Sequence, residues 1–149
     1  MSHKIIDPSG IPFIWKEIEH DKYKYELVYN YNVLLQFKPS QTIISDFYVF
    51  ESNGKLSIRK GYLCDGASGP TMDTLSNMRA AFVHDVIYQM LRRGELGQVY
   101  KNPGDLELHR LMIEDYSPSW FGGSLWSRFR ANYYYQGVRF FGGGSCRRS

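Results

Sequence analysis

Hydrophobic and polar positions follow two different periods along this chain, and the first is typical of β-strands. Residues 23–37, 42–51 and 55–63 are short runs rich in Tyr, Val, Ile, Leu and Phe, which favour extended backbone. Asn53 and Gly54 separate the last two runs, and this pair suits a type I′ hairpin turn because both of its central residues need positive φ. The pattern predicts an antiparallel sheet in the N-terminal part of the chain.

The centre of the chain changes to a helical period. Between about residues 73 and 93, apolar side chains recur every three or four positions, at Leu75, Met78, Phe82, Val86 and Met90. We expect Gly94 to end this helix. A second helix is predicted to begin with Asn102 as N-cap and Pro103 at its first position and to run to about residue 116. A third, basic and aromatic helix is predicted over about residues 124–141.

Strands followed by helices, without βαβ alternation, predict an α+β fold in which an N-terminal antiparallel sheet packs against about three C-terminal helices. The 149 residues suit a single domain, with a flexible tail rich in Gly and Arg from about residue 142. Neither a Gly-rich phosphate-binding fingerprint nor a zinc ribbon is present, which argues against a doubly wound nucleotide-binding fold. We expect neither a membrane-spanning helix nor a signal peptide, since no apolar run has the required length.

The cysteine content favours a reducing environment. Only two cysteines occur, Cys64 and Cys146, and the second lies in the Gly-rich tail, where ordering the chain around a disulfide is costly. We therefore expect reduced thiols, and residence in a reducing compartment or within an assembled particle.

The positive charge is concentrated at the C-terminal end. From Ser117 onward the chain carries five arginines and no acidic residue, after a slightly acidic body. Arg128 and Arg130, together with Trp126, could contact phosphate-bearing partners such as the headgroups of a membrane lipid surface. The alternative is a tail helix that packs its aromatic side chains inward and solvates its arginines.

One turn of the first predicted helix carries the residues best suited to chemistry. His84 and Tyr88 are four positions apart and share a face, while Asp85 points about 100° round the same turn. A titratable base, a carboxylate and a phenol thus lie within a mostly apolar helix, where a buried charge needs a partner or a metal. The alternative is a hydrogen-bonded core histidine beside an exposed aspartate.

Asp105, at the start of the second predicted helix, is the candidate partner. Two antiparallel helices joined by a short loop would bring Asp105 beside Tyr88 and His84. The alternative is a capping role, because counting from Asn102 makes Asp105 the third helical residue, where an acid meets the helix dipole. His109 follows Asp105 by four positions, which suits a metal pair with His84 nearby, although a partly exposed surface histidine fits the same spacing.

The segment 65–70 connects the last strand run to the helix that carries His84. Gly66 and Ser68 let the backbone approach a ligand closely, and with Asp65 the loop could ligate a hard cation. An ordinary connection between a strand and a helix would have the same composition.

The same residues resemble a phage and prophage family of unassigned function. Its members are marked by a Thr-Asp-Gly-Ala-Ser loop, a helical His-Asp-x-x-Tyr and then Ala-Asp-x-x-Phe. The matching segments here are residues 65–68, 84–88 and 104–108, with a similar ending at residues 134–142. Three positions depart from the pattern, Cys64, Gly104 and Leu108, where members have Thr, Ala and Phe. The resemblance implies a phage-encoded protein that is made in the host cytoplasm and can associate with the virion.

A more distant resemblance suggests an activity. The His-Asp-x-x-Tyr helix, the glycine-bearing loop before it and the aspartate on the next helix are similar to the active site of secreted phospholipases A2, especially compact bacterial ones. This resemblance implies that His84 is the general base that activates water and that Asp105 and Tyr88 orient its imidazole. It also implies that Asp85 binds calcium together with loop carbonyls near Gly66 and Ser68. The strand-first layout and the lack of disulfides differ from those enzymes, so only the local arrangement carries over.

We therefore expect a calcium-dependent hydrolase of lipid or another ester. One alternative is a non-enzymatic virion or assembly protein, with other virion proteins as partners and a purely structural cluster of His84, Tyr88 and Asp105. Another is a different metal-dependent hydrolase, directed at peptidoglycan or a phosphoester, with ligands from His84, Asp85, Asp105 and His109. Zinc would be favoured if His109 takes part, and magnesium or manganese if it does not. Nucleic acid is the least favoured partner.

Overall fold

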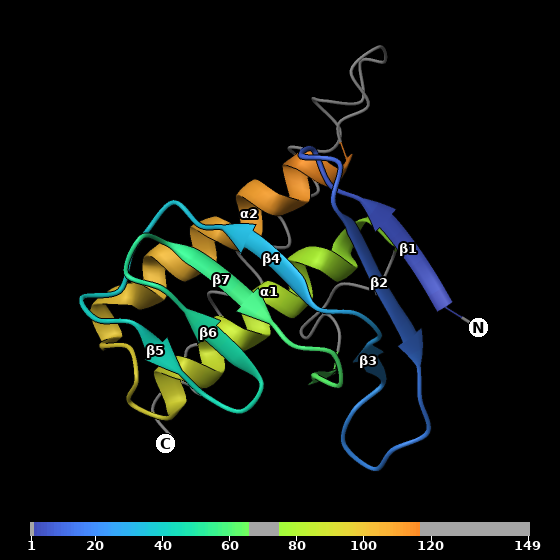
Figure 1. The fold of residues 1–149 in the computed structure, drawn as a ribbon, viewed down its shortest axis with the longest axis horizontal. Helices are drawn as coiled ribbons and strands as arrows, with labels where there is room; N and C mark the ends of the chain where they lie inside the picture. The colour runs from blue at the N-terminus through green and yellow to red at the C-terminus, as the bar shows by residue number, and fades with distance from the viewer. Residues whose placement is uncertain (1, 66–74, 117–149) are drawn as a thin grey trace. The chain divides into compact units, whose positions relative to one another are not determined.

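A computed structural model of the chain describes residues 2–65 and 75–116 (Figure 1). Its residues cluster into two compact units, Met1–Gly66 and Ala67–Ser149. The first holds the strands and the second holds the helices, which confirms an α+β fold with N-terminal strands. The third predicted helix and the predicted flexible tail lie outside the described residues.

Eight short strands form two four-stranded antiparallel sheets in the N-terminal unit, where the sequence predicted one (Figure 1). The first sheet has the order β1 (Ser2–Ile6), β2 (Pro12–Glu17), β3 (Tyr25–Leu27), β8 (Leu63–Cys64). The second has the order β4 (Tyr31–Leu34), β7 (Lys55–Ile58), β6 (Tyr48–Phe50), β5 (Ile43–Ile44). The sequence pattern had not assigned strands before residue 23, so β1 and β2 were missed.

The run 23–37, expected to be extended throughout, is divided between the two sheets. Asp7 lies at this division: its Oδ2 accepts a hydrogen bond of 2.6 Å from the Tyr31 hydroxyl, and its Oδ1 accepts bonds from the amides of Ser9 and Ile11. The Phe13 ring packs edge-on against Tyr31, with ring centres 5.1 Å apart. A carboxylate from the first hairpin is therefore bonded to the first residue of the second sheet.

The β6–β7 hairpin predicted at Asn53 and Gly54 is confirmed, but the predicted turn type is wrong. Gly54 has φ +95°, whereas no residue other than glycine has positive φ within the described part of the chain, so Asn53 does not fit a type I′ turn. The Gly54 amide donates to the Glu51 carbonyl, and the Glu51 amide donates to the Lys55 carbonyl. This is a three-residue loop in which glycine alone takes the left-handed conformation.

The core of the strand unit is aromatic. Trp15 on β2 and the β6 residues Tyr48 and Phe50 have exposed fractions of 0–1%. Tyr48 pairs with Ile58 across the ladder and Phe50 with Leu56, so these side chains share one face of the second sheet. Cys64 on β8 is buried as well.

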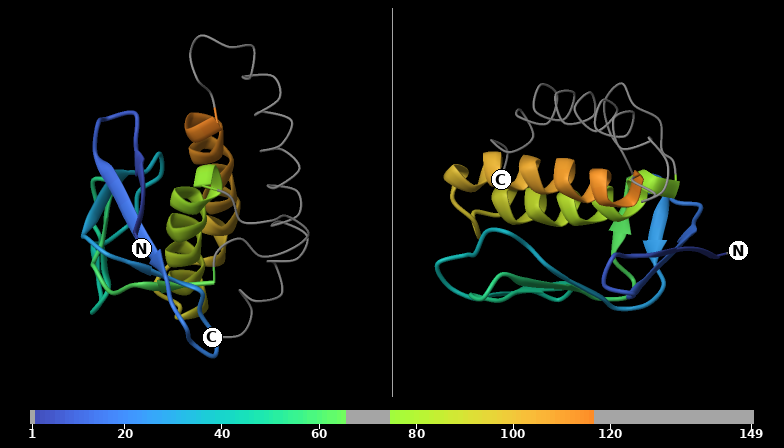
Figure 2. Two further views of the ribbon diagram at one scale, coloured as in Figure 1. Left: turned by 90° about the vertical axis from the view of Figure 1, so that its right-hand side faces the viewer. Right: turned by 90° about the horizontal axis from the view of Figure 1, so that it is seen from above.

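Two antiparallel helices form the described part of the second unit (Figure 2). α1 (Leu75–Arg92) ends as predicted at Gly94, which has φ +72°. The Gly94 amide donates to the Leu91 carbonyl and the Glu95 amide to the Met90 carbonyl, the paired bonds of a Schellman motif. A short 3-10 turn, η1 (Gln98–Tyr100), then leads directly into α2 (Lys101–Tyr116).

The predicted N-cap of α2 is wrong. Asn102 lies inside the helix, because η1 supplies the turn before it and α2 begins at Lys101. Pro103 is in the first turn, where a missing amide proton is tolerated. Asp105 is thus the fifth residue of α2, and its capping role is not observed.

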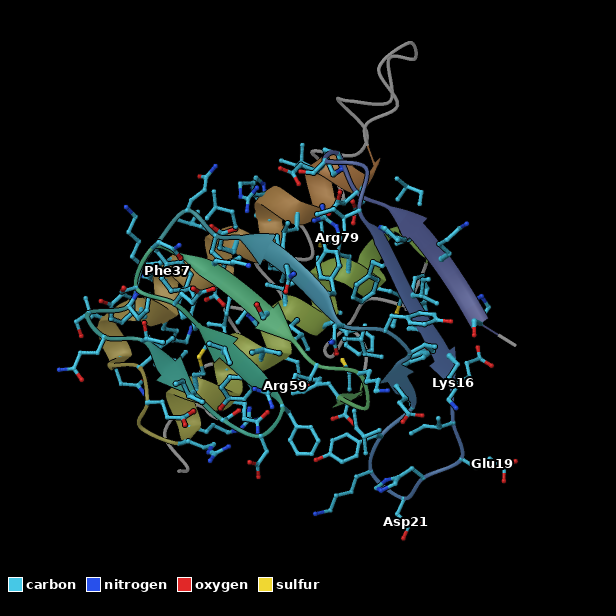
Figure 3. All side chains as sticks on the ribbon, in the orientation of Figure 1. Lys16, Glu19, Asp21, Phe37, Arg59 and Arg79 are labelled. Atoms are coloured by element: carbon cyan, nitrogen blue, oxygen red, sulfur yellow. The ribbon has the colours of Figure 1, made fainter. Side chains whose placement is uncertain are left out.

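The two helices are held together by close packing and by a buried ion pair. A Cβ atom built on Gly104 would lie 2.7 Å from Cγ2 of Ile87, so the backbone of α2 approaches α1 too closely for a larger residue. Arg79, labelled in Figure 3, lies near the start of α1, and Asp115 lies near the end of α2. The Arg79 side chain is 1% exposed and binds both carboxylate oxygens of Asp115. Glu114 accepts a further bond of 2.9 Å from the same guanidinium. No helix in residues 2–65 and 75–116 is long and apolar enough to cross a membrane.

Candidate functional site

The antiparallel helices bring together the three residues predicted to form the site. Nε2 of His84 lies 2.9 Å from Oδ1 of Asp105, and the Tyr88 hydroxyl donates to the same oxygen at 2.7 Å. The imidazole and phenol rings are in contact, with centres 4.0 Å apart. The proximity that the helical spacing predicted is confirmed, and it depends on α2 lying directly against the face of α1 that carries His84 and Tyr88.

Asp105 is an ionised carboxylate in a buried position. Its side chain has an exposed fraction of 0%. Burial raises the pKa of Asp105, but the hydrogen bonds from His84 and Tyr88 and the charge of Lys101 outweigh this effect, so the net pKa lies below its ordinary value of 3.8. The carboxylate therefore stays charged at neutral pH and accepts every hydrogen bond that it makes.

The tautomer of His84 follows from the charge of its partner. Because Asp105 can only accept, Nε2 of His84 must carry the proton and donate to it. Burial lowers the pKa of His84 from 6.5, the charges of Lys101 and Arg92 act in the same direction, and Asp105 opposes them without reversing the shift. The imidazole is therefore neutral at about pH 7, with its lone pair on Nδ1.

The second ring nitrogen, Nδ1, carries the lone pair of this tautomer. In the described part of the helical unit, His84 forms its hydrogen bond through Nε2. Its side chain keeps an exposed fraction of 12%, so the ring is mostly enclosed but not sealed from solvent. A neutral imidazole whose Nδ1 lone pair faces a water molecule can accept a proton from it, while the Asp105 carboxylate stabilises the imidazolium that forms.

Lys101 belongs to the same cluster and was not singled out from the sequence. Its Nζ lies 3.2 Å from Oδ2 of Asp105 and 5.9 Å from the centre of the Tyr88 ring. The signal was present, because Lys101 and Asp105 are separated by four positions, which places them on one face of a helix. The predicted helix began at Asn102, so Lys101 fell outside it.

The other predicted site residues are only partly accounted for. Asp85 is half-buried on α1 next to His84, Asp65 is exposed after β8, and His109 is half-buried one turn after Asp105. Within the described residues, no three His, Cys, Asp or Glu side chains gather closely enough to hold a metal ion. The predicted loop ligands Gly66 and Ser68 and the predicted membrane contacts Trp126, Arg128 and Arg130 lie outside the described residues.

Comparisons of this chain with protein families, with curated proteins and with solved structures found no match. Within the described residues, the candidate site is the cluster formed by His84, Tyr88, Lys101 and Asp105.

Proposed function

We propose that this protein is a phage-encoded hydrolase that cleaves an ester, with lipid esters as the leading substrate class and His84 as the general base. The observation that carries this proposal is the bond from Nε2 of His84 to the buried Asp105 carboxylate at 2.9 Å. It leaves a neutral imidazole with a free lone pair on Nδ1, which is the state that a general base needs at neutral pH.

The proposed reaction uses His84 twice. Nδ1 removes a proton from water as the water oxygen attacks the ester carbonyl carbon, and the resulting imidazolium then donates this proton to the departing alkoxide. Asp105 holds the ring in one orientation and offsets the positive charge that forms on it, and the Tyr88 hydroxyl, bonded at 2.7 Å, steadies the carboxylate. The products are a carboxylic acid and an alcohol, and the histidine returns to its starting state.

Calcium is the proposed cofactor. Calcium prefers hard oxygen ligands, and Asp85, the residue after His84, would supply a carboxylate oxygen. Backbone carbonyls at Gly66 and Ser68 would supply further oxygens. Bound there, the ion would polarise the ester carbonyl and stabilise the oxyanion. The arginines and tryptophan around Trp126 would meet an anionic lipid surface.

One observation favours a structural role as the second candidate. Asp105 is fully buried and its partners His84 and Tyr88 lie on the other helix, so the network also ties α1 to α2. In that case the protein would be a virion or assembly component, and the cluster would contribute to stability alone.

Replacing His84 with alanine separates the two candidates. As a hydrolase, His84→Ala should lose about 100-fold or more in the rate of ester cleavage, the usual contribution of a general base. The assays are release of para-nitrophenol from para-nitrophenyl butyrate and of fatty acid from phosphatidylglycerol vesicles, each with calcium and with a chelator.

The matched control is His20→Ala, which removes an exposed histidine from the strand unit. Circular dichroism of both variants reports whether the helices remain folded. Ester cleavage that survives in His84→Ala at the natural rate rejects the hydrolase, and a large fall in melting temperature without any measurable activity in the natural protein favours the structural role.

A further inference from the structure

Lys101 occupies an unusual position for a lysine. It is the first residue of α2, and the first turn of this helix contains no acidic residue. The helix dipole places partial positive charge at this end, so a cation here is disfavoured by the helix itself. Its side chain is also only 20% exposed, which removes much of the water that would stabilise the charge. The charged form of Lys101 therefore needs stabilisation from the groups around its ammonium.

Within the described residues, those groups belong to the candidate site. The ammonium lies 3.2 Å from Oδ2 of Asp105 and 5.9 Å from the centre of the Tyr88 ring. The contact with the ring is a cation–π interaction, and the contact with the carboxylate is a charge-assisted hydrogen bond. Lys101 thus contacts Asp105 and Tyr88, the two residues of the cluster that touch the imidazole of His84.

The bonds to Asp105 divide its two oxygens between different partners. Oδ1 accepts from His84 and Tyr88, while Oδ2 accepts from Lys101. A carboxylate held through one oxygen alone can turn about its Cβ–Cγ bond, which would change the angle at which it meets the imidazole. Because Lys101 lies one helical turn before Asp105 on the same helix, its bond to Oδ2 limits this rotation.

We propose that Lys101 is a positioning residue of the site: its ammonium anchors Oδ2 of Asp105 and leaves Oδ1 facing His84, which keeps the imidazole in the tautomer with the proton on Nε2. Only the effect of Lys101 on the reaction rate depends on the proposed hydrolase function. Its effect on the tautomer of His84 is a property of the helical unit and can be measured whether or not the protein cleaves esters.

The test compares Lys101→Met, which removes the charge, with Lys101→Arg, which keeps it. Heteronuclear NMR of protein labelled at the histidine ring nitrogens reports the tautomer of His84 at neutral pH. Hydrolysis of para-nitrophenyl butyrate by the 149-residue chain gives kcat and KM. Lys101→Gln serves as a second uncharged variant should the methionine variant fail to fold, and Lys22→Met, at an exposed position of the strand unit, is the matched control.

We expect a clear division among the variants. Lys101→Met and Lys101→Gln should show a mixture of His84 tautomers and a kcat lower by about tenfold, equivalent to about 1.4 kcal/mol, with little change in KM. Lys101→Arg should restore the single tautomer and most of kcat, and Lys22→Met should match the natural protein. If Lys101 were merely structural, its uncharged variants would not lower kcat while leaving KM unchanged. Lys101→Arg would then not restore kcat together with the single tautomer of His84.

Two results would overturn the proposal. One is a single Nε2-protonated tautomer in both uncharged variants, whatever happens to their activity. The other is a loss of this tautomer that Lys101→Arg fails to restore. If the natural protein cleaves no ester, the proposed function fails, and the tautomer measurement still decides the role of Lys101.

Discussion

Replacing Asp105 with asparagine keeps the size of this side chain and removes its charge. The carboxylate is fully buried and accepts hydrogen bonds of 2.9, 2.7 and 3.2 Å from His84, Tyr88 and Lys101. A hydrogen bond to a charged group contributes about 1.5–3 kcal/mol, and a neutral one about 1 kcal/mol. With the amide oxygen toward His84 and Tyr88, two bonds become neutral and the amide nitrogen meets the Lys101 ammonium, donor against donor.

We therefore expect Asp105→Asn to lower the free energy of unfolding by about 2–4 kcal/mol, because Lys101 is partly exposed and can turn toward water. In a chain of this length, such a loss lowers the melting temperature by about 5–15 °C. Thermal unfolding followed by far-ultraviolet circular dichroism measures it. If the amide turns its nitrogen toward His84, the imidazole takes the wrong tautomer, and ester cleavage should fall by roughly 100-fold or more.

The matched control is Asp21→Asn, in the exposed loop between β2 and β3 (Figure 3). An exposed substitution of this kind should change stability by no more than about 0.5 kcal/mol. The reasoning is refuted if Asp105→Asn melts within about 2 °C of the natural protein, since the buried charge would then contribute nothing that an amide cannot replace.

Two further predictions concern packing and pH. Gly104→Ala places a Cβ 2.7 Å from Cγ2 of Ile87 and should destabilise the protein by about 1 kcal/mol, because overpacking outweighs the gain in helix propensity. Ile87→Leu removes that branch and should rescue the alanine variant in a double-mutant cycle of urea unfolding, whereas additive losses would show that the two positions do not clash. The pKa of His84 is lowered from 6.5 in the folded state, so the unfolded chain takes up a proton first, and stability should decline as pH falls below 6.5. His84→Gln should abolish this decline between about pH 7 and pH 5, and an unchanged slope in that variant would assign it to other groups.

Much of the site could be predicted from local sequence rules. His84 and Tyr88 share a helix face because they are four positions apart, and a short connection between two amphipathic helices favours antiparallel packing, which brings Asp105 to them. The predicted start of the second helix was wrong because Asn102 and Pro103 are a common N-terminal pair, whereas the 3-10 turn before them depends on backbone geometry. That error removed Lys101 from the predicted site.

Glycine at position 104 also has a structural reason. Sequence spacing shows that α1 and α2 can be neighbours, but it does not show how closely they approach. The contact with Ile87 explains why glycine fits at this position, and it is a property of two packed surfaces. The run 23–37 shows the same limit of local spacing, because its division between two sheets is set by pairing with distant strands. The bond between Asp7 and Tyr31, which are 24 positions apart, is another contact of this kind.

By itself, the sequence determined the order of strands before helices, the end of α1 at Gly94 and the shared face of His84 and Tyr88, because each depends on neighbours within one or two turns of the chain. Only the tertiary structure decided that Asp105 is buried, that its two oxygens are divided between His84 and Lys101, and that the imidazole bonds to this carboxylate through Nε2. Burial and charge at one atom are set by every group packed around it, and no local spacing encodes them.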